Sequence, residues 1–426
     1  MDRLCVSALP RFRDKKFGFR CLAKLRNHPV PKSLATLPAP REPVRVEPAQ
    51  PTPAASPPRL WSLDVLRGGC ALVVFLTHWH LWSNFTPRPG AEQFVRAFGD
   101  NCYAAFVKLT WPTGGHHPAV ICFFVLSGFC IHYPFAWRAQ AGLPRGGWPD
   151  YFRRRFRRIM PAYWAACLLG LVFVLVETRH PGGSPLLTLH SAAPVEEIFV
   201  RFTALGGLYP REIFSGNYLL NTVAVEILMY ALYPLFFHYA MRGHWRSLGV
   251  AFVLMQLVAV VLLRFVTPYW VFNSILMLGL FWYIGALAAQ LYVTRNAVVP
   301  GIWFLGSWVV FLALKAVPHF YGITLLWQAA WALVCTFGIL WALRREELHP
   351  ESRDRPIVAA MRYSGKISYS LYAVHTPAIM LATWGLLVVA GTTDYFVQLA
   401  ATLAASAAAT LLTYYGVERV FYRPRV

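Results

Sequence analysis

Long apolar stretches separated by polar and basic segments make up the chain from Trp61 onward. A helix that crosses a membrane needs about 20 apolar residues in a row. Ten stretches meet this length, with approximate limits 63–86, 118–138, 157–177, 217–241, 246–266, 270–293, 299–317, 321–342, 366–390 and 395–418. The pattern predicts an all-α polytopic membrane protein.

Residues 1 to about 58 follow a different pattern, basic up to Lys32 and rich in Pro and Ala from Pro38 to Pro58. Such a segment cannot bury a core, so we expect a disordered cytoplasmic tail ahead of a transmembrane domain over residues 59–426. The tail lacks the continuous apolar run of a signal peptide. Its basic cluster could touch anionic lipid, or the segment could be dispensable.

Composition and charge agree with a membrane protein. The chain is 57% hydrophobic and 14% charged, which excludes an ordinary soluble domain. Of its 40 Lys and Arg residues, 31 lie on the side that holds both termini of a ten-span chain and 8 on the other. Because Lys and Arg gather on the cytoplasmic side, we expect both termini in the cytoplasm and the protein in the cell (inner or plasma) membrane. The net charge of +21 therefore follows topology and does not indicate nucleic acid.

Two predicted outward loops are long, 87–117 and 178–216. In the second, four apolar residues fall at roughly helical spacing, Ile198, Phe199, Phe202 and Leu205. This spacing indicates a segment on the membrane surface or one that dips into the bundle. The first ends with His116 and His117, whose spacing matches no zinc pattern. None of the eight cysteines forms a CxxC pair. We therefore expect no metal site and no disulfide framework.

The first span, LDVLRGGCALVVFLTHWH, carries ionisable side chains inside an apolar run. Eleven residues make about three helical turns plus 20°, so Arg67 and His78 share one face about 16 Å apart, while His80 points away. Ionisable groups inside a membrane usually face a cavity or a partner. The alternative is an Arg that reaches the interface and a His that packs in the bundle.

The second and fourth spans add polar groups. The pair Ser127-Gly128 indicates close helix packing, whereas a Ser127 nucleophile would need a base and an oxyanion site. Glu226 is the single acid of the fourth span and lies at the predicted depth of His78. A carboxylate at that depth would hold the tautomer of the histidine and raise its basicity.

Five arginines crowd the start of the third span in YFRRRFRRIMPAYW. Arg155 and Arg158 lie on one helix face, and guanidinium groups suit the phosphates of a nucleotide or coenzyme. Anionic lipid or simple topology would also explain the cluster. In the ninth span, Ser368, Tyr372 and His375 form one stripe, so His375 either contacts a ligand or packs beside a proline kink.

Six segments in order resemble the acyltransferase 3 family of membrane-bound O-acyltransferases, which includes O-antigen acetylases. They are LDVLRG followed by His78, FFVLSGF, RRFRRIMPAYW, the span with Glu226, GKISYSLYAVHTP and VERVFYRP. The resemblance covers nearly all of the chain from Trp61 to Pro424. It implies transfer of an acyl group, commonly acetyl from acetyl-CoA, to a hydroxyl of a glycan or related molecule. It also implies that Arg67 and His78 are essential.

We therefore expect an acyltransferase in which His78, supported by Glu226, is the general base and Arg67, Arg155 and Arg158 bind acyl-CoA. Ser127, Ser368 and His375 are possible substrate-site residues, and a covalent acyl intermediate is an alternative to direct transfer. Acyl-CoA is a co-substrate, and no tightly bound cofactor is expected. Many relatives carry an esterase-like domain after the last span, and none is expected here because the chain ends at Val426. A multi-pass transporter of a small anionic or glycan-related substrate is the alternative function.

Overall fold

A computed structural model describes residues 56–422, apart from 83–89, 111–115, 192–193, 210–212, 214–215, 266–270, 272 and 318–323. In these residues the chain forms helices and no strand, so the predicted all-α class is confirmed. The predicted tail over residues 1–58 lies almost wholly outside the described residues.

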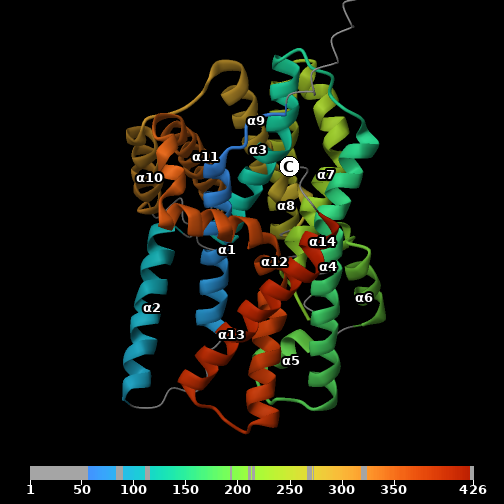
Figure 1. The fold of residues 1–426 in the computed structure, drawn as a ribbon, viewed down its shortest axis with the longest axis vertical. Helices are drawn as coiled ribbons and strands as arrows, with labels where there is room; N and C mark the ends of the chain where they lie inside the picture. Colours follow the sequence, from blue (N-terminus) through green and yellow to red (C-terminus); the bar gives the residue numbers. More distant parts are fainter. Residues whose placement is uncertain are drawn as a thin grey trace, which may run out of the picture. The chain divides into compact units, whose positions relative to one another are not determined.

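The described helices follow one another as shown in Figure 1. The long helices are α1 (Trp61–Trp82), α2 (Ala91–Thr110), α3 (Pro118–Gln140), α4 (Trp148–Arg179), α7 (Leu220–Met241), α8 (Trp245–Phe265), α9 (Ile275–Arg295), α10 (Gly301–Lys315), α11 (Thr324–Leu348), α12 (Pro356–Trp384) and α13 (Tyr395–Thr413). The short ones are α5 (Pro185–Ser191), α6 (Val195–Phe202), α14 (Arg419–Phe421), the 3-10 turns η1 (Gly206–Leu208) and η3 (Pro350–Asp354), and the π-helical turns η4 (Gly385–Val389) and η5 (Tyr414–Glu418).

Eight of the described helices are long and apolar enough to cross a membrane, which makes the protein a polytopic membrane protein. They are α3, α4, α7, α8, α9, α11, α12 with η4, and α13 with η5 and α14. Two of the ten predicted spans fall outside this set. Helix α1 carries Asp64 and Arg67 in its first half, and α10 has only 15 residues. The count of ten spans and the cytoplasmic termini stay predictions.

Two spans begin earlier than their apolar stretches. Helix α4 starts at Trp148 instead of 157, and α12 starts at Pro356 instead of 366. Each has a proline in its first turn, where the missing backbone N–H has no helical partner to lose. The arginine-rich segment of α4 is therefore continuous with the span, and Pro161 lies inside this helix.

The two loops predicted to face outward contain helices that hydropathy does not reveal. Helix α2 occupies 20 residues of the predicted 87–117 loop, with Phe94 and Phe98 exposed on one face. Its sequence alternates apolar and polar residues, so no window in it is apolar enough to predict a span. His80 bonds Asp100 of α2 at 3.0 Å. In the second loop, α6 contains Ile198, Phe199 and Phe202, so their helical spacing is confirmed, whereas Leu205 lies beyond the end of this helix.

Two pairs of helices pack so closely that their backbones touch. A Cβ on Gly68 of α1 would lie 2.5 Å from the Met361 carbonyl oxygen of α12, and one on Gly365 would overlap the Asp64 carbonyl. Helices α3 and α9 meet in the same way, because a Cβ on Gly128 would overlap the Trp282 carbonyl. Small residues allow such contacts between membrane helices. The close packing predicted for Ser127-Gly128 is thus confirmed.

The start of α1 is fixed by α11. The Glu346 carboxylate accepts hydrogen bonds from the backbone N–H groups of Trp61 and Ser62 at 2.9 Å and from the Ser62 hydroxyl at 2.6 Å. The first N–H groups of a helix have no partner within it, and an acid there also suits the helix dipole. This cap anchors the end of α1 that lies nearest to Arg67.

We expect Gly68→Ala to lower the midpoint of thermal unfolding in detergent and Gly69→Ala to leave it unchanged or raise it. Both substitutions add the same methyl group to neighbouring positions of α1. At Gly69 the new Cβ would meet only the end of the Met361 side chain, at 3.5 Å, whereas at Gly68 it meets backbone. Overpacking of this kind costs about 1–3 kcal/mol. Equal midpoints for the two variants would contradict the close approach of α1 and α12.

Candidate active site

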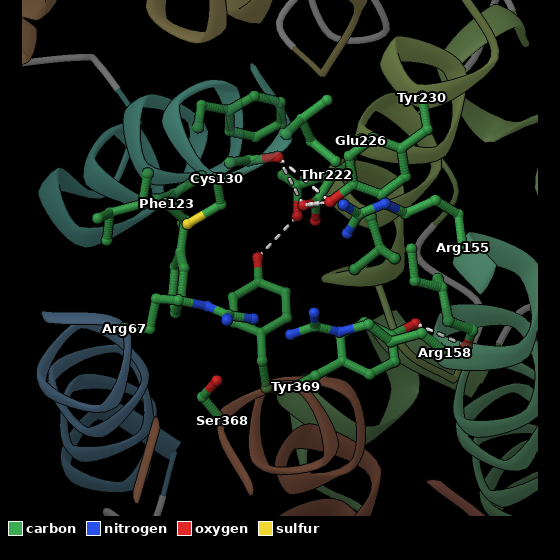
Figure 2. Close-up of a pocket in the computed structure, with 18 residues that line it drawn as sticks. Arg67, Phe123, Cys130, Arg155, Arg158, Thr222, Glu226, Tyr230, Ser368 and Tyr369 are labelled. Carbon is green, nitrogen blue, oxygen red and sulfur yellow. Dashed lines mark hydrogen bonds between the residues drawn. The ribbon is translucent and has the colours of Figure 1, made fainter. Parts of the chain in front are cut away.

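A cavity of about 90 Å³ lies among α1, α3, α4, α7 and α12 (Figure 2). Arg67 of α1, Arg155 and Arg158 of α4, and Glu226 of α7 line it together with Ser368 of α12. The structure thus brings together side chains that the sequence assigned to one site from four separate spans. The remaining lining residues are largely apolar or aromatic.

The cavity has an excess of positive charge. It contains three arginines and one carboxylate, and none of the three guanidinium groups forms a salt bridge within the described part of the chain. Arg155 lies over the Tyr230 ring at 5.5 Å. Buried charge is costly unless it is paired. These side chains therefore suit an anionic ligand, to which guanidinium groups can bind bidentately.

Glu226 is held by hydroxyl groups. The Ser127 hydroxyl donates to Glu226 Oε1 at 2.8 Å, and the Tyr230 hydroxyl donates to the same oxygen. Ser127 and Tyr230 also lie within hydrogen-bond distance of each other at 3.2 Å. This cluster fixes one carboxylate oxygen in the wall of the cavity.

His78 and His375 form a pair beside the cavity, between α1 and α12. Nδ1 of His78 lies 3.0 Å from Nε2 of His375, and the ring centroids are 5.3 Å apart. Nε2 of His78 lies 3.1 Å from the Tyr218 hydroxyl. His78 is 7% exposed and His375 is fully buried. His375 therefore contacts the candidate base directly, which the sequence did not predict.

The predicted contact between Glu226 and His78 is wrong. Glu226 bonds Ser127 and Tyr230, while both ring nitrogens of His78 are engaged by His375 and Tyr218. The prediction rested on the equal depth of Glu226 and His78 in the membrane. Equal depth does not determine which helices are neighbours in the bundle. His375 on the neighbouring helix α12 occupies the place expected for the carboxylate.

Tyr372 connects the cavity to the histidine pair. It lines the cavity, and its ring centroid lies 6.3 Å from that of His375. Its hydroxyl bonds the Thr222 hydroxyl at 2.7 Å, and its ring meets Phe123 edge-on at 5.6 Å. The predicted stripe of Ser368, Tyr372 and His375 thus runs from the cavity wall to His78.

Three further residues lie in this region that the sequence did not indicate as site candidates, His117, His190 and Tyr218. The His117 ring centroid lies 6.3 Å from that of His78, and the His190 ring stacks on Tyr218 at 5.5 Å. Tyr218 could have been found from its place at the outer end of the fourth span. The other two lie in the outward loops, whose path a sequence does not determine. Across the described residues, no group of three or more His, Cys, Asp or Glu side chains could hold a metal ion.

The arginine cluster divides into separate parts. Arg155 and Arg158 face the cavity, whereas Arg153 is exposed and bonds Asp150 at 2.6 Å. Arg154 lines a second cavity of about 230 Å³ together with Arg138 and other residues. Since α4 turns by about 100° per residue, neighbouring arginines point in different directions. The cluster therefore presents cations to at least two places.

The comparisons with known proteins identify the family. The acyltransferase 3 family model, described as an acyltransferase domain, matches residues 60–415. The chain belongs to the acyltransferase 3 family. The resemblance seen in the sequence is thereby confirmed. No curated protein and no solved structure matches the chain. With its membrane-spanning helices, this member of the acyltransferase 3 family is a multi-pass membrane acyltransferase.

A double-mutant cycle on thermal stability can test the pairing of His78. Because His78 contacts His375, we expect the effects of His78→Ala and His375→Ala on the free energy of unfolding to deviate from additivity by about 0.5–3 kcal/mol. The effects of His78→Ala and Glu226→Ala should add to within about 0.5 kcal/mol. The reverse pattern would restore the predicted contact with Glu226.

Proposed function

We propose that the protein is an O-acyltransferase of the cell membrane that moves an acetyl group from acetyl-CoA to a hydroxyl of a cell-surface glycan or related acceptor. The family supports acyl transfer in general. The observation that carries the choice of donor is the cavity with Arg67, Arg155 and Arg158, because coenzyme A presents several phosphates. The acceptor class comes from the family resemblance.

The donor would enter from the side where α4 begins. Its phosphates would bind the guanidinium groups of Arg155 and Arg158, and Arg67 would guide the arm toward Tyr372 and the histidine pair. Glu226 would not repel the phosphates strongly, because two hydroxyl groups already donate to one of its oxygens. Its role in this proposal is to order Ser127 and Tyr230 in the cavity wall.

The transfer step needs a base near the acceptor, and His78 is suited to that role. Nε2 of His78 would take the proton of the acceptor hydroxyl while its oxygen attacks the thioester carbonyl. The new carbon–oxygen bond replaces the carbon–sulfur bond, and the departing thiolate takes the proton from the imidazolium. The products are the ester and free coenzyme A, with no other reactant.

We expect His78→Ala to lose transfer by about 10²- to 10⁴-fold, the usual contribution of a general base. The assay uses native host membranes, which contain the natural acceptor, with labelled acetyl-CoA, and measures label in the surface fraction and free thiol. Binding of acetyl-CoA to purified protein should persist, which shows that the variant is folded. Full activity in this variant would exclude His78 as the base.

The same assay separates the enzyme from a transporter. Free thiol released together with labelled ester supports acyl transfer. Movement of a labelled solute across the membrane without thiol release would refute the proposed function. Mass spectrometry of surface glycans from cells with and without the intact gene identifies the ester that is lost.

Arg155→Ala and Arg158→Ala should raise the KM for acetyl-CoA by about 10- to 100-fold, since a hydrogen bond to a charged group contributes about 1.5–3 kcal/mol. Arg153→Ala is the matched control, because Arg153 lies on the same helix but outside the cavity and pairs with Asp150. It should leave KM unchanged. An equal effect of all three substitutions would show that the cluster acts only through its overall charge.

A further inference from the structure

The contact of His375 with a backbone carbonyl group determines which ring nitrogens of the histidine pair carry protons. Nδ1 of His375 lies 2.8 Å from the Leu371 carbonyl oxygen, one turn earlier in α12. A carbonyl oxygen can only accept a hydrogen bond, so His375 must carry a proton on Nδ1. In the neutral ring, its Nε2 is then an acceptor.

This acceptor determines the tautomer of His78. Since His375 Nε2 accepts, His78 donates from Nδ1 across the 3.0 Å contact. The lone pair of neutral His78 therefore lies on Nε2, where the Tyr218 hydroxyl is 3.1 Å away and donates to it. The chain of contacts from Leu371 to Tyr218 thus leaves one nitrogen of His78 able to take a proton.

The pair is also held in place by packing. The Phe75 ring meets His375 edge-on at 5.9 Å, and Tyr372 does so at 6.3 Å. His375 is 0% exposed. Helices α1 and α12 also pack in close contact at Gly68 and Gly365, about 15 Å along the two helices from the pair. His375 has therefore little freedom to turn its ring or to leave His78.

We propose that His375 is a positioning residue that holds His78 in the tautomer with Nε2 free of its own proton and directed to the acceptor side. The inference rests on the proposed function. A neutral histidine takes the role that a carboxylate commonly has beside a histidine base. When His78 takes the acceptor's proton on Nε2, its Nδ1–H continues to donate to His375, so the ring does not turn during transfer.

The test compares His375→Leu with His375→Gln in the labelled acetyl-CoA assay with native host membranes. Leu removes the acceptor, and turnover at saturating acetyl-CoA should fall by about 10²-fold while KM for acetyl-CoA stays unchanged. Gln offers an amide oxygen to His78 Nδ1, so turnover should recover to within about tenfold of the parent protein. Thr376→Val is the matched control, since Thr376 is the buried neighbour on α12. It should keep full turnover.

The results separate a positioning role from a structural one. The amount of acetyl-CoA bound at saturation gives the number of folded molecules in each preparation. The inference is overturned if turnover per binding-competent molecule is normal in His375→Leu, or if His375→Gln loses as much as His375→Leu. Absence of thiol release from the parent protein would instead refute the proposed function, a result that these variants do not affect.

Discussion

The direct contact between the backbones of α1 and α12 is the constraint on which the site depends. Side chains at Gly68 and Gly365 would push the helices apart, because each would meet a carbonyl oxygen of the other helix. With both glycines in place, Arg67 and Ser368 border one cavity, and His78 and His375 come within 3.0 Å. The α3–α9 contact at Gly128 has the same character, and the preceding residue, Ser127, bonds Glu226 of α7. The positions of these polar side chains thus depend on glycines, which let the helix backbones approach.

The site separates positive charge from His78, the proposed base. The guanidinium groups gather around the cavity, while His78 contacts His375 and Tyr218. The rise of α1 puts Arg67 and His78 about 16 Å apart. An arginine touching His78 would oppose the imidazolium that forms during proton transfer. In the proposed reaction, this distance would let the protein bind a strongly anionic donor and still form an imidazolium at His78.

The cavity also shows how a membrane bundle can keep several arginines. Glu226 is the single carboxylate among its lining residues and is occupied by hydroxyl donors. Aromatic rings lie against Arg155 and Arg158, which offsets part of the cost of removing their charge from water. Binding of the proposed anionic donor would offset the remaining cost, so affinity for such a donor and the stability of the bundle would depend on the same side chains.

Much of this arrangement is already present in the sequence, because hydropathy and the helical period are local properties. They determine the all-α membrane class, the shared face of Arg67 and His78, and the shared face of Arg155 and Arg158. They also place the small residue Gly128 in an apolar run, where close packing follows. The family resemblance adds the reaction class, since its motifs recur in order along the chain.

The neighbours around the bundle were decided only by the tertiary structure. Glu226 and His78 share a depth, yet Glu226 bonds Ser127 and Tyr230 while His78 bonds His375. Hydropathy locates a residue along the membrane normal and says nothing about which helix stands beside it. The sequence alone therefore identified Arg67 and His78 as candidate site residues on one face of α1. The contacts of His78 with His375 and Tyr218, from which its tautomer is inferred, required the packing of α12 against α1 and the position of the residues just before α7.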